Sequence, residues 1–141
     1  MMKSADTGIS VRIIVCGGRH FDDYNRMRST IDGVIAEIGS SVTAVEIVSG
    51  HCAGADQLGE KYAEEHGYPC KVFPANWEKH GRAAGPIRNS EMIKYASEAE
   101  VPVVVAFRSP RTRGTNDTVK KATKKGFKVV VVDYDQTAGQ R

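Results

Sequence analysis

The sequence predicts an α/β protein built on one doubly wound, five-stranded parallel sheet with helices on both faces. Two observations lead to this fold class. Short apolar runs rich in Val and Ile alternate with longer segments in which apolar residues recur at helical spacing, which is typical of a parallel sheet covered on both sides. The length of 141 residues suits a single domain with one core. We therefore expect one domain over residues 10–134, with flexible tails at 1–9 and 135–141.

The five expected strands are the apolar runs, each of a length usual for a buried parallel strand. They are Val11–Cys16, Ala44–Ser49, Cys70–Pro74, Val101–Phe107 and Phe127–Asp133. Four helices are expected between them, near Asp22–Ile38, Ala55–His66, Pro86–Ser97 and Thr115–Lys125. In the first helix, apolar residues such as Met27, Ile31 and Val34 fall on one face. Right-handed crossovers in a chain of this size favour the strand order 3-2-1-4-5.

The composition is that of an ordinary globular protein, with 40% hydrophobic residues, 26% charged residues and a formal net charge of +3. No apolar run approaches the roughly 20 residues that cross a bilayer, and the amino terminus lacks the apolar core of a signal peptide. We expect a cytoplasmic protein with no membrane partner. Three cysteines without CxxC pairing predict reduced thiols. The histidine and cysteine spacing predicts no metal site, and we expect no cofactor.

Three unusual loops join the carboxyl ends of expected strands to the starts of expected helices: CGGRHFDD, SGHCAGAD and RSPRTRGTND. Open parallel sheets bind ligands at this edge, where the strand order reverses. Glycines let a ligand approach the backbone, helix amino termini favour anions, and guanidinium groups match phosphate geometry. The loops therefore predict a site for a phosphate or another anionic group of a nucleotide. The predicted ligand-binding residues in these loops are Gly17, Gly18, Arg19, Ser49, Gly50, Gly54, Arg111, Arg113, Gly114 and Thr115.

A fourth stretch, NWEKHGRAAGPIRNSEM, is expected to be a long loop that leads into a helix. Arg82 and Arg88 lie near the start of that helix, where a cation is unfavourable unless an anion is close. Both are predicted to bind the ligand. The alternative is structural: Arg88 pairs with Glu91 or Asp56, and Trp77 covers the sheet edge.

Two standard nucleotide motifs are missing from the sequence. Neither G-x-G-x-x-G nor G-x-x-x-x-G-K-[ST] occurs, so neither standard nicotinamide nor standard ATP chemistry is indicated. Asp56, in the first turn of an expected helix, would orient a ribose hydroxyl or Arg113, or would serve only as a partner of the helix dipole.

A basic run favours a second class of partner. Between Arg108 and Lys128 there are eight basic residues and one acidic residue, which indicates a single-stranded nucleic acid as the alternative partner. The lysines near the end of the expected helix also suit a solvated face that complements the helix dipole. The near-balanced net charge counts against the nucleic-acid interpretation.

Four segments in this order resemble the SLOG superfamily, and most closely its small single-domain YspA-like branch. They are VCGGRHFDD, VSGHCAGADQLGEKYA, FPANWEKHGRAAGPIRNSEM and RTRGTND. The superfamily includes the LOG phosphoribohydrolases, which release a base from a nucleoside monophosphate, and the DNA-processing protein A, which binds single-stranded DNA. The resemblance implies a Rossmann-like sheet, a homo-oligomer, and a nucleotide or nucleotide-derived ligand such as ADP-ribose that is either sensed or hydrolysed.

The resemblance also implies roles for particular residues. The superfamily motif SGGxxG falls on Ser49–Gly54, an RKxxM-like segment on Arg88–Met92, and the PGGxGTxxE motif on Pro110–Thr118. Thr118 stands where LOG enzymes have their catalytic Glu, which leaves open whether this chain is an enzyme. If the chain is an enzyme, Asp56, Glu91 or Asp117 is expected to be the carboxylate that polarises a water or stabilises a sugar cation, and Arg88 is predicted to act in catalysis beside it. The alternative function is a single-stranded nucleic-acid binding module.

Overall fold

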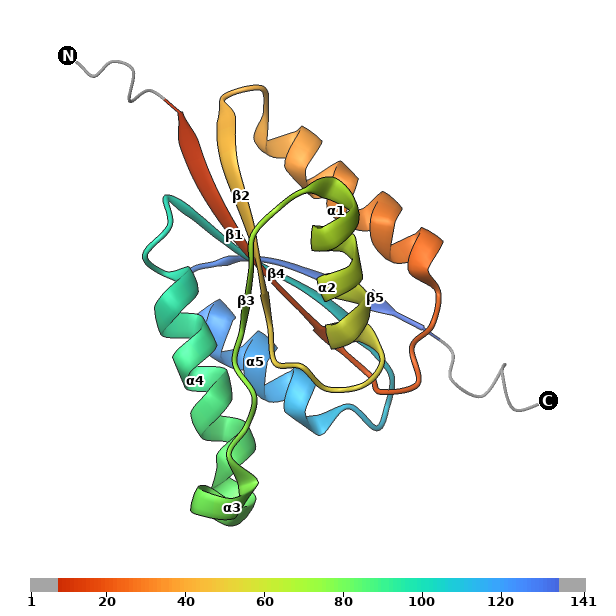
Figure 1. The fold of residues 1–141 in the computed structure, drawn as a ribbon, viewed down its shortest axis with the longest axis vertical. Helices are drawn as coiled ribbons and strands as arrows, with labels where there is room; N and C mark the ends of the chain where they lie inside the picture. The colour runs from red at the N-terminus through yellow and green to blue at the C-terminus, as the bar shows by residue number, and fades with distance from the viewer. Residues whose placement is uncertain (1–7, 135–141) are drawn as a thin grey trace.

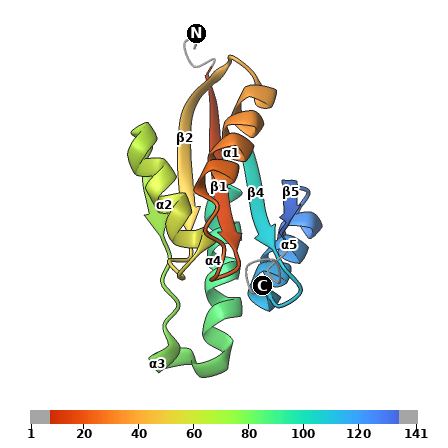
Figure 2. The same ribbon diagram turned by 90° about the vertical axis from the view of Figure 1, so that its right-hand side faces the viewer.

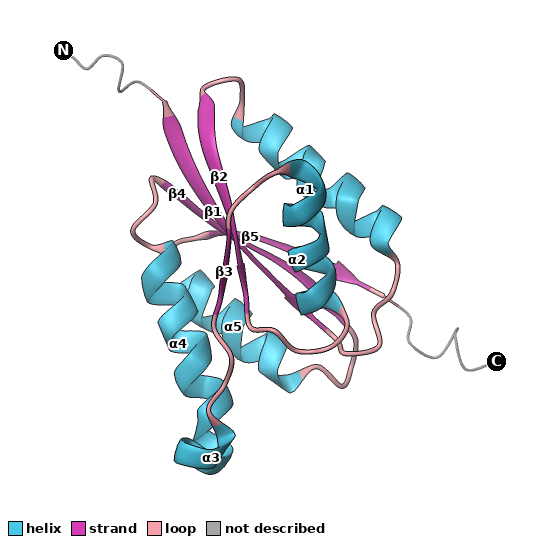
Figure 3. Ribbon diagram, in the orientation of Figure 1, coloured by secondary structure: helices cyan, strands magenta, loops and turns pink. Residues whose placement is uncertain are grey.

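The computed structural model describes residues 8–134 and contains a five-stranded parallel sheet in the order β3-β2-β1-β4-β5. The strands are β1 (Ile9–Gly17), β2 (Val42–Ser49), β3 (Cys70–Val72), β4 (Val101–Arg108) and β5 (Lys128–Asp133). The helical elements are α1 (Tyr24–Ile38), α2 (Ala55–His66), α3 (Trp77–His80), the 3₁₀ turn η2 (Gly81–Ala83), α4 (Ala84–Ala96) and α5 (Arg113–Lys124). The predicted fold class and strand order are confirmed (Figures 1 and 3).

Helices α1 and α2 cover one face of the sheet, and α4 and α5 cover the other (Figures 1 and 2). Alternate residues of β1 point to opposite faces. Ile13 packs with Met27 and Ile31 of α1, whereas Ile14 packs with Met92 of α4. Two apolar clusters, one on each face, therefore hold the layers together. Among residues 8–134, no helix has both the length and the apolar character that spanning a bilayer requires.

The largest difference from the predicted elements lies in the expected long loop before α4, which contains α3 and η2. Helix α3 begins where the Asn76 side chain accepts a hydrogen bond from Lys79 N at 3.0 Å, a helix cap that the sequence analysis did not identify. Helix α4 begins two residues before Pro86, because the first backbone N–H groups of a helix have no partner within it and a proline there removes no hydrogen bond.

Helix α5 also begins earlier than predicted, at Arg113, so that Arg113 and Gly114 belong to its first turn. A turn before it is closed by Thr112, whose Oγ1 donates to Ser109 O at 2.8 Å. At the other end of the chain, Ile9 is the first residue of β1, within the segment that we expected to be a tail. The rest of the expected tails, residues 1–7 and 135–141, lies outside the described residues.

The position of α2 depends on Gly59. A Cβ atom at this residue would lie 2.8 Å from Val15 Cβ on β1, whereas a Cβ atom at Gly33 of α1 would have no neighbour within 4 Å. The missing side chain at Gly59 therefore allows α2 to lie close to the sheet.

These two glycines predict opposite effects of the same substitution. Gly59→Ala is expected to lower the free energy of unfolding by about 1–3 kcal/mol, because the methyl group overpacks the contact with Val15. Gly33→Ala is expected to raise it by about 0.5–1 kcal/mol, because alanine is the better helix former. Urea denaturation of both variants measures this, and stabilisation by both would show that α2 moves away from β1 at no cost.

Candidate functional site

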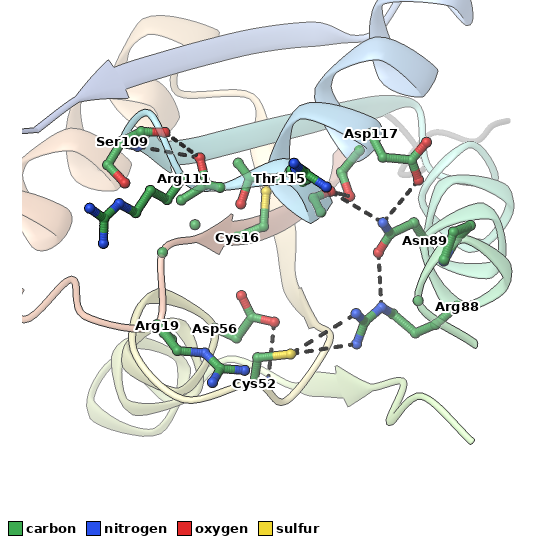
Figure 4. A pocket seen from close by; sticks show the side chains of 18 of the residues that line it. Cys16, Arg19, Cys52, Asp56, Arg88, Asn89, Ser109, Arg111, Thr115 and Asp117 are labelled. Atoms are coloured by element: carbon green, nitrogen blue, oxygen red, sulfur yellow. Dashed lines mark hydrogen bonds between the residues drawn. The ribbon is translucent and has the colours of Figure 1, made fainter. Parts of the chain in front are cut away.

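A cavity of about 690 Å³ lies at the carboxyl edge of the sheet, beside the point where the strand order reverses between β1 and β4. Five parts of the chain line it: the end of β1 with the loop after it, the loop after β2 with the start of α2, the segment from α3 into α4, the loop after β4 with the first turns of α5, and Tyr134 after β5. Figure 4 shows these side chains converging from different elements. Its size and its place at the reversal are typical of a small-molecule site.

Most of the predicted site residues line this cavity. They are Gly17, Gly18, Arg19, Asp56, Arg88, Arg111, Arg113, Gly114, Thr115 and Asp117. The other five, Ser49, Gly50, Gly54, Arg82 and Glu91, are not among its lining residues. Arg82 in η2 and Glu91 in α4 are both exposed.

Ser49 and Gly50 lie next to residues that line the cavity, Asp56 and Arg88. Ser49 is completely buried, and its Oγ lies 2.8 Å from Glu60 Oε2. The carbonyl oxygen of Gly50 accepts a hydrogen bond from Arg88 Nη1 at 2.7 Å, and a Cβ atom at Gly50 would lie only 2.6 Å from that nitrogen. Gly50 therefore helps to position Arg88, whereas Ser49 contacts α2.

Gly54 joins the start of α2 to the loop after β1. Its φ of 84° lies in the left-handed region, and a Cβ atom there would lie 2.3 Å from Gly18 O. The same carbonyl accepts a hydrogen bond from Ala55 N at 3.1 Å. Glycine is required here because two backbone segments meet without room for a side chain.

Arg88 is a buried cation, only 8% exposed, that α4 places beside the cavity. Its Nε donates to Asn89 Oδ1 at 2.9 Å, and its two terminal nitrogens each lie 4.0 Å from Cys52 Sγ (Figure 4). No carboxylate of residues 8–134 lies within ion-pair distance of it, so the alternative pairing with Glu91 or Asp56 is not observed. The carboxylate of Asp56 acts on this guanidinium only through space, so Arg88 keeps N–H donors that an anionic ligand could accept from.

Asn89 is a site residue that the sequence analysis missed. It is 3% exposed, and its Nδ2 donates to Asp117 Oδ2 at 3.0 Å and to Gly114 O at 3.3 Å, so it links α4 to α5. A signal for it exists in the sequence. Asn89 lies three and four residues before Met92 and Ile93, which places this polar side chain on the buried face of the helix, where it needs partners.

Asp117 already holds a cation. Its Oδ2 accepts a second hydrogen bond from Lys121 Nζ at 2.8 Å. Partial burial raises the pKa of Asp117, but the hydrogen bonds from Lys121 and Asn89 outweigh it, and the pKa lies below its usual value. Lys121 also donates to Pro86 O at 2.9 Å, which adds a second link between the two helices.

Asp56 lies in the first turn of α2 and is 6% exposed. Burial raises the pKa of this carboxyl to about 6, although hydrogen bonds from the backbone of Cys52 and Gly17 and the charge of Arg88 act in the opposite direction. Asp56 therefore changes from the ionised to the protonated form as the pH falls from neutral through about 6. It offsets the positive charge of the cavity less at the lower pH.

Three exposed guanidinium groups complete the site. The side chains of Arg19, Arg111 and Arg113 line the cavity and form no hydrogen bond or ion pair with any of residues 8–134. The first turn of α5 contains no acidic residue, and Thr112 makes no side-chain cap, so the first backbone N–H groups of this helix have no partner among residues 8–134. With Asp117 neutralised by Lys121, the cavity has an excess of positive charge.

Two further residues differ from what their positions in the sequence suggest. Thr118, at the place of the LOG glutamate, is 1% exposed, and its Oγ1 donates to Gly114 O at 3.3 Å. Trp77 does not cover the sheet edge: it lies on α3 and belongs to neither apolar cluster.

Residues 8–134 contain no group of three or more His, Cys, Asp or Glu side chains arranged to hold a metal ion.

The fold and the cavity define a doubly wound α/β protein with an anion-favouring site at the reversal of strand order. A family model described as "YspA, cpYpsA-related SLOG family" matches residues 11–80, from β1 to the end of α3. The "Gene 61 protein" of Mycobacterium phage D29 is 30% identical over 125 residues, which cover 84% of this chain and 94% of that protein. No solved structure is significantly similar to the chain. The chain belongs to the YspA, cpYpsA-related SLOG family, which confirms the resemblance seen in its motifs.

The raised pKa of Asp56 predicts a pH dependence of stability. The folded protein holds a proton on this carboxyl up to about pH 6, whereas an unfolded chain releases it near pH 3.9. Asp56 therefore contributes more to stability as the pH falls through 6, and this contribution is lost as the pH rises above 6. Between pH 7 and pH 5, the wild type is expected to gain about 1 kcal/mol of unfolding free energy relative to Asp56→Asn.

Urea denaturation of both proteins at the two pH values measures the difference, and the variant corrects for every other titrating group. Parallel changes in the two proteins would show that Asp56 has an ordinary pKa.

Proposed function

We propose that the protein binds a nucleotide-derived ligand with phosphate on ribose, such as ADP-ribose, in the cavity beside β1 and β4. The observation that carries the proposal is the set of guanidinium groups of Arg19, Arg111 and Arg113 around one cavity, none of which bonds to any of residues 8–134. Arginine forks match phosphate oxygens, and such contacts are stronger than those between neutral groups. Membership of the SLOG family supports this ligand class.

One phosphate would lie at the start of α5, against Arg113, Gly114 and Thr115, because free N–H groups and the positive end of the helix dipole favour an anion there. The glycines after β1 contribute space more than hydrogen bonds, since Gly18 N already donates to Phe107 O at 3.0 Å. Arg19, in the same loop, supplies charge from the opposite side of the cavity.

Arg88 would hold a second anionic group. A guanidinium has five N–H donors, and those not used on Asn89 and Gly50 have only Cys52 Sγ as a neighbour, at 4.0 Å, among residues 8–134. An oxyanion is a much better acceptor than a thiol. Asn89 and Gly50 fix the plane of this guanidinium, so it presents its donors in a set direction.

The site supports recognition better than hydrolysis. Of the predicted catalytic carboxylates, Glu91 is not in the cavity lining and Asp117 is bonded to Lys121. Asp56 is the remaining one, and its pKa of about 6 suits a general base or acid. A hydrolase would therefore depend on Asp56, since Thr118 has no carboxylate.

Removing two of the exposed guanidinium groups tests the proposal. The double variant Arg19→Ala/Arg113→Ala is expected to bind ADP-ribose at least about tenfold more weakly, because charge-assisted hydrogen bonds are worth roughly 1.5–3 kcal/mol each. Isothermal titration calorimetry measures the affinity. The matched control is Lys124→Ala/Lys125→Ala, which removes two exposed charges outside the cavity and is expected to leave the affinity unchanged.

Two further measurements separate the alternatives. A short single-stranded oligonucleotide that binds more tightly than ADP-ribose, with a steep salt dependence and a loss of affinity in the lysine variant, would replace the proposal with a nucleic-acid binding module. Chromatography of bound ligand after incubation distinguishes a sensor from a hydrolase, and any turnover is expected to disappear in Asp56→Asn. The homo-oligomer implied by the resemblance stays a prediction, which light scattering on the purified protein would check.

A further inference from the structure

Trp77 is the single tryptophan of the chain and, within residues 8–134, the one large hydrophobic side chain that is exposed, at 58%. Its indole stacks on no aromatic ring of the described residues and packs in neither apolar cluster. It does line the cavity. A single exposed apolar side chain is ordinary by itself, but this one lines a cavity, where it can contact a ligand.

The position of the ring is fixed by the elements around it. Asn76 caps the start of α3 through Lys79 N, and Trp77 is the first residue of that helix. A Cβ atom at Gly85 would lie 3.5 Å from Trp77 Cη2, so one edge of the indole lies over the start of α4. The remaining surface of the ring is available on the side of the cavity. Figures 1 and 2 show α3 at the tip of the molecule, beyond the amino end of α4.

The cavity therefore combines two kinds of lining. Arg19, Arg111 and Arg113 come from the loops after β1 and β4, whereas Trp77, Gly85 and Pro86 come from α3 and the start of α4. A nucleotide combines the same two chemistries, an anionic phosphate and a flat heteroaromatic base. Indole surfaces bind bases by stacking, and they do so with little preference for one base because every base presents a π face.

We propose that Trp77 stacks on the base of the bound ligand, so that the site selects nucleotides over sugar phosphates that have no base. This inference rests on the proposed function and adds the part of the ligand that the arginines do not recognise. Phosphate binding by the arginines gives affinity for any ribose phosphate, and contact with the indole gives the preference for one that carries a base.

The test compares AMP with ribose 5-phosphate, which has the same sugar phosphate without the base. Because the chain has a single tryptophan, its emission reports directly on Trp77. AMP is expected to change the emission and to bind at least about tenfold more tightly than ribose 5-phosphate, a ratio within the range for base–aromatic stacking. Ribose 5-phosphate is expected to bind without the stacking signal.

Two variants separate stacking from charge. Trp77→Ala is expected to lower the affinity for AMP by about tenfold and to leave the affinity for ribose 5-phosphate unchanged, whereas Trp77→Phe keeps most of the preference because it retains a flat ring. Both variants are expected to unfold at the wild-type urea concentration, because the indole lies outside the core. The Arg19→Ala/Arg113→Ala variant is expected to lose affinity for both ligands.

The outcomes distinguish this inference from the proposed function. If AMP binds the wild type and Trp77→Ala equally well, or binds without changing the emission, the stacking contact is overturned while phosphate recognition stands. If AMP, the other common nucleoside monophosphates, ADP-ribose and ribose 5-phosphate all fail to bind, both are overturned.

Discussion

The site exists because the chain leaves two neighbouring strands in opposite directions. After β1 it crosses to the face covered by α1 and α2, and after β4 it crosses to the face covered by α4 and α5. Within residues 8–134, neither of these two connections covers the edge between the strands, so a crevice remains there. The apolar faces of the helices fix this geometry, because helices that did not pack on the sheet would expose both apolar clusters to water. The lining residues of the loops after β1 and β4 take their positions from this divergence.

Within that crevice, the electrostatic balance depends on which charges already have partners. Asp117 is bonded to Lys121, and Asp56 is buried enough for its proton to be retained to about pH 6. Arg19, Arg111 and Arg113 form no ion pair with any of residues 8–134, and Arg88 has the charge of Asp56 near it only through space. A count of charges along the sequence shows only a small excess of positive charge, whereas the cavity concentrates it. This concentration explains how a nearly neutral protein offers a favourable environment for an anion.

The fold was predictable because it depends on patterns that a sequence displays directly. Alternating Val-rich and amphipathic segments determine the layers, and the strand order follows from the crossovers. The existence of α3 was less predictable, because its start depends on a single side-chain hydrogen bond by Asn76, and the start of α5 follows a turn closed by Thr112 and Ser109. The positions of the loops at the strand ends were also predictable, because they follow from the alternation of Val-rich and amphipathic segments.

The detailed roles of site residues were harder to predict. Loops rich in glycine indicate that something approaches the backbone, but not what approaches it. At Gly54 it is another backbone segment, and at Gly50 it is the side chain of Arg88. Asn89 was missed because its importance comes from two contacts with α5, a helix that lies 25 residues or more further along the chain. In α4, Arg88 is buried and Glu91, three residues later, is exposed. A small error in the predicted rotation of the helix about its axis would assign the buried and exposed positions the wrong way round.

The two walls of the cavity differ in mechanical compliance. On the side of α2, Gly54 meets the backbone of Gly18 with no side chain between them, so this contact has no rotamer through which to adjust. On the side of α4 and α5, the links run through the side chains of Asn89 and Lys121, which have rotatable bonds. The first wall is stiff and the second is yielding, so differences in the size of a bound molecule would be absorbed by movement of α4 and α5 while the loop after β1 keeps its place.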